Sequence, residues 1–467
     1  MQYPRLYVAL TATVFTAMTA VLTFFPRSSF SELEKRDLAR FPEFTLERLA
    51  SGEFTRDVSA WFSDSEPYRD RLMTLSMRVK QRTRLALNDE SVTFHAAEEE
   101  MEEAGETPTP AIVGDPLEEY HRADADAADE NAKVAHAGII IVGRGDNVRA
   151  LMAYGGTGGG EEFAKMVNEY ADVFDGQAQV YCMVIPNATE FYIPEKMKGR
   201  SKPQVATIRN IHEHLSPKVK PVNVYNALGR HAGEDIYLRT DHHWSPLGGF
   251  YAANEFARIA DVPFEDLTSY DENVVHGFVG SMYGYSKDIS VKEAPEDFVY
   301  YVPRDVDYVT RYTAYETNDK YQITRILFQN SGPYFYKHRN GSSGAYNTFM
   351  GGDQRLTKVM TTTPNGRRLM IIKDSFGNTL PGYFFYSFEE VHVVDNRYFH
   401  LNMKDYVRDN GITDILIASS VFNAYSKKGF CRNCLRYLNQ DPADAFAAPK
   451  KKATPKEHKE EAAAQED

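Results

Sequence analysis

Four apolar stretches, each followed directly by polar residues, constrain the fold of this chain most strongly. They cover residues 178–186, 367–373, 389–394 and 411–420. Nearly continuous apolar runs of this length are typical of strands that are buried on both faces of a parallel sheet. Helical patterns alternate with these runs, so the sequence predicts a doubly wound α/β sheet. In such sheets ligands bind beyond the carboxyl ends of the strands, where the polar residues follow.

We expect this sheet to lie in one domain over residues 135–440. The chain has 467 residues, of which 42% are hydrophobic, so it can bury a large core. Residues 262–365 are rich in tyrosine and glycine and contain short β-leaning pieces, which indicates an insertion or cap. Ser245 and Pro246 predict the start of a helix within the domain.

Residues 6–25 form an uncharged apolar run near the amino terminus. Twenty helical residues span about 30 Å, the thickness of the hydrocarbon core of a bilayer. No clear small-residue cleavage site follows, so we predict that residues 1–27 are an uncleaved single-pass membrane anchor. A cleaved signal peptide is the alternative, which would make the protein secreted. In both cases the rest of the chain is extracytoplasmic.

Three further segments flank the predicted domain. The residue pattern at 28–93 predicts short helices with a polar face. Residues 94–134 are acidic and rich in alanine, and residues 441–467 are charged and of low complexity, so both are predicted to be disordered. The net charge of −13 argues against nucleic acid as a partner.

Two of the three cysteines, Cys431 and Cys434, form a Cys-x-x-Cys pair. In an exported protein this spacing favours a short structural disulfide. A thioredoxin-like redox pair would need a strand before it, and a zinc site would need two more ligands.

Acidic, imidazole and hydroxyl side chains follow the strand at 367–373 and a further, shorter strand expected within residues 235–240. Asp241, His242 and His243 are consecutive, and Ser375 comes just after the strand at 367–373. Serine is a weak nucleophile that needs a base, and the base needs an acid to orient it. We therefore predict a chain of contacts from Asp241 through His243 to Ser375, each of roughly 2.6–3.2 Å. His242 is expected to point elsewhere and to act as support.

Each part of this constellation also has another interpretation. Ser375 by itself fits a helix N-cap, and the two histidines fit a metal site with His231 and His276 as further ligands. No metal-binding spacing such as His-Glu-x-x-His appears, so we expect neither a metal nor a soluble cofactor. The joint occurrence of both blocks favours the catalytic interpretation.

Three sequence blocks resemble the DHHW family of bacterial envelope proteins. They are SELEKRDLARFPEFTLERL at 31–49, TDHHWSPLGGFYAA at 240–253 and IIKDSFGN at 371–378. That family is similar to the periplasmic alginate O-acetyltransferases and, more distantly, to SGNH hydrolases. The resemblance covers most of residues 28–435. It implies an SGNH-like sheet in circularly permuted order, because the Asp-His block precedes the serine block.

The resemblance also implies roles for individual side chains. Asp241, His243 and Ser375 correspond to the catalytic triad. The oxyanion and substrate-binding side is expected to consist of Asn423, Arg397, His242 and Trp244. The backbone N–H of Ser375 would be the main oxyanion donor, with Asn423 beside it, or else Asn187 or Asn378. Arg397 is expected either to line the cleft or to pair with Asp395 or a neighbouring acid.

The function implied by the resemblance is that of an O-acetyltransferase for a cell-envelope or exported polysaccharide. The acetyl donor would be a membrane-bound O-acyltransferase, and the acceptor a polysaccharide. Two alternatives remain open: a carbohydrate esterase or deacetylase of the same fold, and a non-catalytic envelope assembly or glycan-binding protein.

Overall fold

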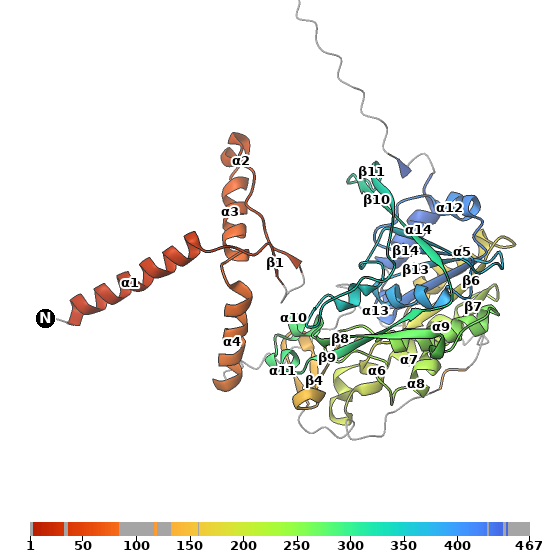
Figure 1. Cartoon of the computed structure of the whole chain (residues 1–467), viewed down its shortest axis with the longest axis horizontal. Coiled ribbons are helices and arrows are strands. Elements are labelled where there is room, and N and C mark those ends of the chain that lie inside the picture. Colours follow the sequence, from red (N-terminus) through yellow and green to blue (C-terminus); the bar gives the residue numbers. More distant parts are fainter. Residues whose placement is uncertain are drawn as a thin grey trace, which may run out of the picture.

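The structure of the chain is a computed structural model, shown in Figure 1. It describes residues 3–31, 36–83, 116–118, 132–156, 158–426, 429–441 and 445–446. Most of the predicted acidic segment at 94–134, and all but a few residues of the predicted tail at 441–467, lie outside the described residues.

An eight-stranded sheet forms the centre of the fold, with the strand order β11-β10-β12-β14-β13-β15-β6-β7. Five neighbouring strands pair in parallel: β14 (Glu390–Asp395), β13 (Arg368–Lys373), β15 (Asp414–Ser420), β6 (Gln179–Ile185) and β7 (Val219–Pro221). The four predicted apolar runs supply β6, β13, β14 and β15. The mostly parallel sheet confirms the predicted α/β class.

Helices pack around this sheet in two groups. The first consists of α5 (Glu161–Val173), α7 (Gln204–Glu213), α12 (Met403–Asn410), α13 (Val421–Tyr425) and α14 (Phe430–Asn439). The second group consists of α8 (Val224–Arg230) and α9 (Pro246–Ala260). Two short helical elements, α6 (Thr189–Tyr192) and η4 (Glu195–Arg200), connect β6 to α7. The predicted start of α9 is confirmed, because the Ser245 hydroxyl accepts from Gly248 N–H at 3.2 Å and Pro246 takes the first turn.

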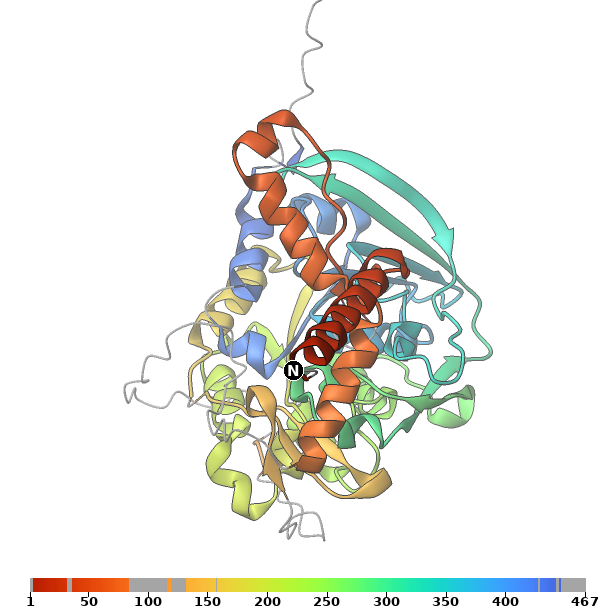
Figure 2. The same cartoon turned by 90° about the vertical axis from the view of Figure 1, so that its left-hand side faces the viewer.

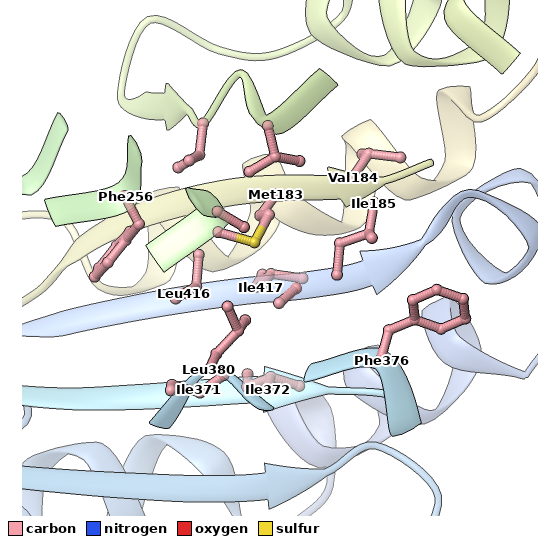
Figure 3. Close-up of a cluster of buried hydrophobic side chains, with 14 of the residues drawn as sticks. Met183, Val184, Ile185, Phe256, Ile371, Ile372, Phe376, Leu380, Leu416 and Ile417 are labelled. Carbon is pink, nitrogen blue, oxygen red and sulfur yellow. The ribbon is translucent and has the colours of Figure 1, made fainter. Parts of the chain in front are cut away.

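The core lies between the parallel strands and α9. Figure 3 shows Met183 and Ile185 of β6 beside Leu416 and Ile417 of β15, with Phe256 of α9 at the same layer. The side chains of all seven residues of β15 are buried. Burial on both faces explains why these strands appear in the sequence as continuous apolar runs.

The segment at 262–365 is β-rich, as predicted. Part of it belongs to the central sheet, and another part forms a separate pair of strands. Its strands β10 (Tyr308–Thr317), β11 (Ile323–Gly332) and β12 (Leu356–Thr361) extend the central sheet, with β12 antiparallel to β14. This pairing satisfies the backbone groups on the outer edge of β14. Strands β8 (Tyr270–Phe278) and β9 (Glu296–Pro303) form a separate pair. The chain between them forms the short helices α10 (Met282–Ser286) and α11 (Ile289–Lys292).

Two short 3₁₀ turns follow β13, where the sequence predicts a helix. They are η7 (Ser375–Thr379) and η8 (Pro381–Phe384). The Asp374 side chain caps the first turn by accepting from Phe376 N–H at 3.0 Å. Pro381 lacks an N–H group, so it cannot continue the hydrogen bonding of a regular helix.

A second apolar cluster joins the small sheet of β3 (Lys133–Val134), β4 (Ile140–Val142) and β5 (Arg149–Leu151) to α10 and α11. Strands β4 and β5 pair in antiparallel fashion as a hairpin. Met73 of α4 (Arg69–Thr83) packs against this cluster.

The amino-terminal part contains α1 (Tyr3–Phe24), the two-residue strands β1 (Phe30–Ser31) and β2 (Arg36–Asp37), α2 (Leu46–Ala50) and α3 (Glu53–Asp64). Figures 1 and 2 show α1 projecting on one side of α2–α4, with the sheet domain on the other. In the described part of the chain, no helix combines enough length with enough apolar character to cross a membrane. The anchor predicted over residues 1–27 is thus not supported, and the cellular location stays a prediction.

The Cys-x-x-Cys pair does not form the expected disulfide. Cys431 and Cys434 both lie in α14 with buried, free thiols. Burial raises the pKa of Cys431 to about 12, so this thiol stays protonated at neutral pH.

Candidate active site

Asp241, His243 and Ser375 form a continuous chain of hydrogen bonds, as the sequence predicts. Asp241 Oδ1 lies 2.6 Å from His243 Nδ1, and His243 Nε2 lies 2.8 Å from Ser375 Oγ. The two polar blocks are 132 residues apart in the chain. Ser375 stands at the carboxyl end of β13, and the Asp-His loop precedes α9, closed by the bridge between Tyr237 and Trp244.

The carboxylate of Asp241 is buried and fully engaged. It also accepts from His243 N–H at 3.1 Å and from Ser281 N–H at 2.8 Å. Burial alone would raise the pKa of Asp241, but the charges of His242 and His243 and these hydrogen bonds hold it well below its ordinary value. A carboxylate that stays ionised can orient a histidine and stabilise its protonated form.

His242 supports this chain from the side. Its Nδ1 lies 2.7 Å from Ser281 Oγ, and its ring lies 3.7 Å from the His243 ring, centroid to centroid. Trp244 differs from the expectation of a substrate-binding role. Its side chain is completely buried and its indole N–H donates to the carbonyl of Phe376 at 2.8 Å. It therefore holds the turn that carries Ser375 rather than facing a substrate.

Tyr346, in the short turn η6 (Ala345–Thr348), is a member of the site that the sequence does not predict. Its ring stacks on His243 with centroids 4.0 Å apart and planes 9° apart. Its hydroxyl donates to the carbonyl oxygen of Ser375 at 3.0 Å. No local motif marks this tyrosine, which lies among many others in the β-rich segment.

The same segment supplies a second support, also missed in the sequence. The buried carboxylate of Glu296 accepts from Thr240 N–H and Thr240 Oγ at 2.6 and 2.5 Å, and from Arg239 N–H at 2.8 Å. Thr240 Oγ accepts in turn from Gly280 N–H at 3.0 Å. Together these bonds fix the backbone that enters the Asp-His loop. A Cβ at Gly280 would lie 2.4 Å from Asp241 Oδ2, so this position requires glycine.

Asn423 lies next to the turn that carries Ser375, at the carboxyl end of β15. Its Nδ2 donates to Asp374 Oδ2 at 2.8 Å, and Ser420 N–H donates to the same oxygen at 2.8 Å. Asp374 thus ties the end of β15 to the residue before Ser375. The other asparagines considered lie in different networks: Asn187 bonds to Gln204, and Asn378 donates to Asp353.

Arg397 takes the ion-pair alternative. Its guanidinium contacts Asp395 at 2.7 Å and Asp353 at 2.6 Å. Behind it the fully buried Lys373 contacts Asp395 at 2.8 Å and Asp353 at 3.1 Å. Burial raises the pKa of Asp353 by itself, but Lys373 and Arg397 outweigh it and hold that pKa well below its ordinary value. This cluster of two cations and two anions adjoins the turn that carries Ser375, because Asn378 of that turn donates to Asp353.

Asp241, His242 and His243 each offer an atom that could bind a metal, and these atoms lie within 4.8 Å of one another. Both nitrogens of His243 already face Asp241 and Ser375, so a metal there would have to displace one of these contacts. The two further ligands considered lie elsewhere: His231 faces Glu234 and His276 faces Asp297. The arrangement fits proton transfer better than a metal centre.

Fold and site together define an α/β protein with a mostly parallel sheet that carries a Ser-His-Asp group at its carboxyl edge. The chain belongs to the DHHW family, because the family model described as "DHHW protein" matches residues 111–394, more than half of its length. A search of curated proteins finds no match.

A solved structure from the same family is among those similar to this chain. The chain is 36% identical to a DHHW family protein from Eubacterium siraeum, covering 67% of this chain and 99% of that one, with a TM-score of 0.60. PatB1 from Bacillus cereus is 19% identical, with coverage of 62% and 99% and a TM-score of 0.49. The O-acetyltransferase domain of AlgJ from Pseudomonas putida is 10% identical, with coverage of 60% and 89% and a TM-score of 0.34.

Proposed function

We propose that this protein is an extracytoplasmic serine acyltransferase that O-acetylates a cell-envelope or exported polysaccharide. The observation that carries the proposal is the hydrogen-bonded chain Asp241–His243–Ser375, with contacts of 2.6 and 2.8 Å. These distances lie in the range needed for proton transfer between a nucleophile, its base and the orienting acid.

The proposed reaction runs through an acyl-enzyme. His243 Nδ1–H donates to Asp241, which leaves the lone pair of Nε2 to accept the proton of Ser375 Oγ. Ser375 Oγ attacks the acetyl carbonyl of the donor, and the protonated His243 returns the proton to the leaving group. An acceptor hydroxyl then gives its proton to His243 and attacks the acetyl-serine, and His243 passes this proton to Ser375 Oγ as the acetyl–serine bond breaks.

The oxyanion of each tetrahedral intermediate needs fixed donors. Ser375 is the first residue of η7, so its N–H has no partner within that turn and can serve as one donor. Asn423 Nδ2 carries two hydrogens: one goes to Asp374 Oδ2 at 2.8 Å, and the other has only a long contact, with Ser420 Oγ at 3.4 Å. We propose that the second is the other oxyanion donor.

We further propose that the sheet is a circularly permuted SGNH-like sheet. Counted cyclically from β13, the parallel strands run β13, β14, β15, β6, β7. Their spatial order β14-β13-β15-β6-β7 is then 2-1-3-4-5. This is one of the common orders of doubly wound sheets, and Ser375 follows the strand at its switch point.

The acetyl group, the polysaccharide acceptor and a membrane-bound O-acyltransferase as donor are proposed on the resemblance of the DHHW and KDSFGN blocks to alginate O-acetyltransferases. Placement outside the cytoplasm is proposed on the apolar run at 6–25.

The test uses the full chain with 4-nitrophenyl acetate as donor and a set of oligosaccharides as acceptors. We expect an acetyl group on Ser375 by peptide mass spectrometry and acetylated acceptor as product, both lost in Ser375→Ala and His243→Gln. His231→Gln is the matched control, because His231 also pairs with an acid but at Glu234. Release of free acetate with no acetylated acceptor would indicate an esterase. Unchanged turnover in Ser375→Ala would refute the catalytic proposal.

A further inference from the structure

The helices α2–α4 expose apolar side chains over a continuous stretch of the amino-terminal part. We define the outer apolar face by its exposed members: Phe41, Phe44, Leu46, Phe62, Tyr68 and Leu72, which are between 44% and 77% exposed. Isolated exposed apolar residues are common in proteins, but a contiguous group of this kind marks an interaction surface.

Contacts connect this face with the segment that follows α1. Phe25, just after α1, contacts Tyr68 with ring centroids 5.7 Å apart. Leu72 N–H donates to Tyr68 O at 2.9 Å, so the first turn of α4 continues directly from Tyr68 to Leu72. At the other end, the Arg27 guanidinium lies 4.2 Å above the Trp61 ring and 5.1 Å from that of Phe62.

The opposite side of α4 faces the sheet domain. Thr74 Oγ lies 3.1 Å from the Tyr283 hydroxyl, and Lys292 Nζ donates to the same Thr74 oxygen at 3.3 Å. Figures 1 and 2 show the same layering, with α1 outside, α2–α4 in the middle and the sheet domain behind. The helix α4 therefore has an inner side bound to the domain and an outer apolar side.

We infer that the outer apolar face of α2–α4 lies flat on a lipid bilayer and holds the sheet domain against the membrane surface. Two observations favour lipid over a protein partner. The helix that leaves from this side is uncharged over residues 6–25, and Leu10, Val14 and Phe15 on it are at least 50% exposed. Arginine, tryptophan and tyrosine side chains lie near the carboxyl end of this helix, and such side chains favour the boundary between water and hydrocarbon.

This inference concerns contact with the bilayer surface and does not require any helix to cross it. Amphipathic helices bind in the plane of the interface, with the apolar side buried at the level of the headgroups and upper acyl chains. It is also independent of the acyl-transfer chemistry, so its test needs no activity measurement.

Tryptophan fluorescence gives a direct test, because the chain has two tryptophans and Trp244 is completely buried. The full chain is added to vesicles of phosphatidylcholine and phosphatidylglycerol in which part of the phosphatidylcholine carries bromine on its acyl chains. We expect the emission of Trp61 to be quenched. Trp61→Phe is the matched control, because it keeps an aromatic ring on the face and leaves only Trp244, whose emission should not respond.

A charged variant separates this contact from attachment through α1. In Leu46→Glu/Leu72→Glu we expect the quenching of Trp61 to be reduced or lost, although the protein still floats with the vesicles. Both residues are exposed, so folding should not suffer, which thermal unfolding checks. Flotation of the unaltered chain without quenching of Trp61, or no binding to vesicles at all, would overturn the inference.

Discussion

Tyr346 lies face to face with His243, with ring centroids 4.0 Å apart and planes 9° apart. Through its hydroxyl the same side chain also holds the carbonyl of Ser375. One residue from the β-rich segment thus contacts both the proposed base and the backbone of the proposed nucleophile. Such a residue restricts the two groups to a single relative position, which is the main requirement for efficient proton transfer.

Substitution of Tyr346 separates its two contacts. In Tyr346→Phe the ring stays and one hydrogen bond is lost, so we expect acetyl transfer to fall by roughly tenfold or less. In Tyr346→Leu the imidazole loses its stacking partner, and kcat should fall by about 10²-fold with little change in KM. Phe349→Leu alters the same aromatic cluster 6.4 Å away and should retain turnover. Steady-state kinetics on the three variants decides between a positioning role and a merely structural one.

A methyl group at Gly280 should disable the site while leaving the fold intact. The added Cβ would lie 2.4 Å from both Cβ and Oδ2 of Asp241, so the carboxylate has to move away from His243. We expect Gly280→Ala to lose at least about 10²-fold in turnover, since small displacements of catalytic groups have effects of this size. Gly233→Ala, where nothing lies within 4 Å, is the control. Normal kinetics in Gly280→Ala would contradict the proposed role of Asp241.

The oxyanion proposal predicts a specific loss in Asn423→Ala. Removal of one oxyanion donor typically lowers turnover by about 10²–10³-fold, so we expect that loss with retained thermal stability. Asn378 likewise donates its amide to a carboxylate, that of Asp353, and Asn378→Ala should have a much smaller effect. The reverse ranking of the two variants would assign the second oxyanion donor to Asn378.

The buried charge cluster under Ser375 should matter for stability. Lys373 has no exposed surface and contacts Asp395 and Asp353. Its removal in Lys373→Met leaves Asp395, which is fully buried, and Asp353 with one cation, Arg397, between them, and we expect a loss of about 3 kcal/mol in the free energy of unfolding. Arg397 is 41% exposed, so Arg397→Ala should lose less, about 1 kcal/mol. Urea unfolding of both variants tests the ranking, and equal losses would contradict it.

Burial of His212 should make the free energy of unfolding fall as the pH is lowered. Burial lowers the pKa of His212 from 6.5 to about 4, so the folded state binds this proton less readily than the unfolded state. Its contribution to stability is complete above pH 6.5 and falls as the pH drops towards 4, by up to about 3 kcal/mol. Urea unfolding at several values of pH should show a shallower decline in His212→Leu. Parallel declines in the two proteins would show that other groups dominate.

Much of the sheet is predictable because the evidence is local. Strands β6, β13, β14 and β15 are buried on both faces, so each appears as a continuous apolar run in the sequence. Ser375 is likewise predictable, because a reactive group at the end of a buried strand is conspicuous among apolar neighbours, and Asp241 and His243 are predictable because an acid and two histidines are adjacent in one short block. The start of α9 follows from Ser245 and Pro246, whose capping preferences do not depend on the rest of the fold.

Other features depend on contacts between segments far apart in the chain. Arg397 was compatible with a cleft or an ion pair, and the approach of Asp353 from the β-rich segment decides for the pair. The free state of Cys431 and Cys434 follows from their place in one buried helix, which the spacing alone does not reveal. Trp244 looked like a binding residue because of its neighbours, but packing of the Ser375 turn against it buries the ring completely.

The sequence by itself therefore determined the class of fold, the strands and the three groups of the proposed triad, since burial and local chemistry leave direct traces in residue type and spacing. Only the tertiary structure decided which side chains support that triad. Tyr346, Ser281 and Glu296 reach the site from one β-rich segment, and each does so through a hydrogen bond or a ring contact set by chain topology. Such contacts depend on distance in space, which residue type at a single position does not encode.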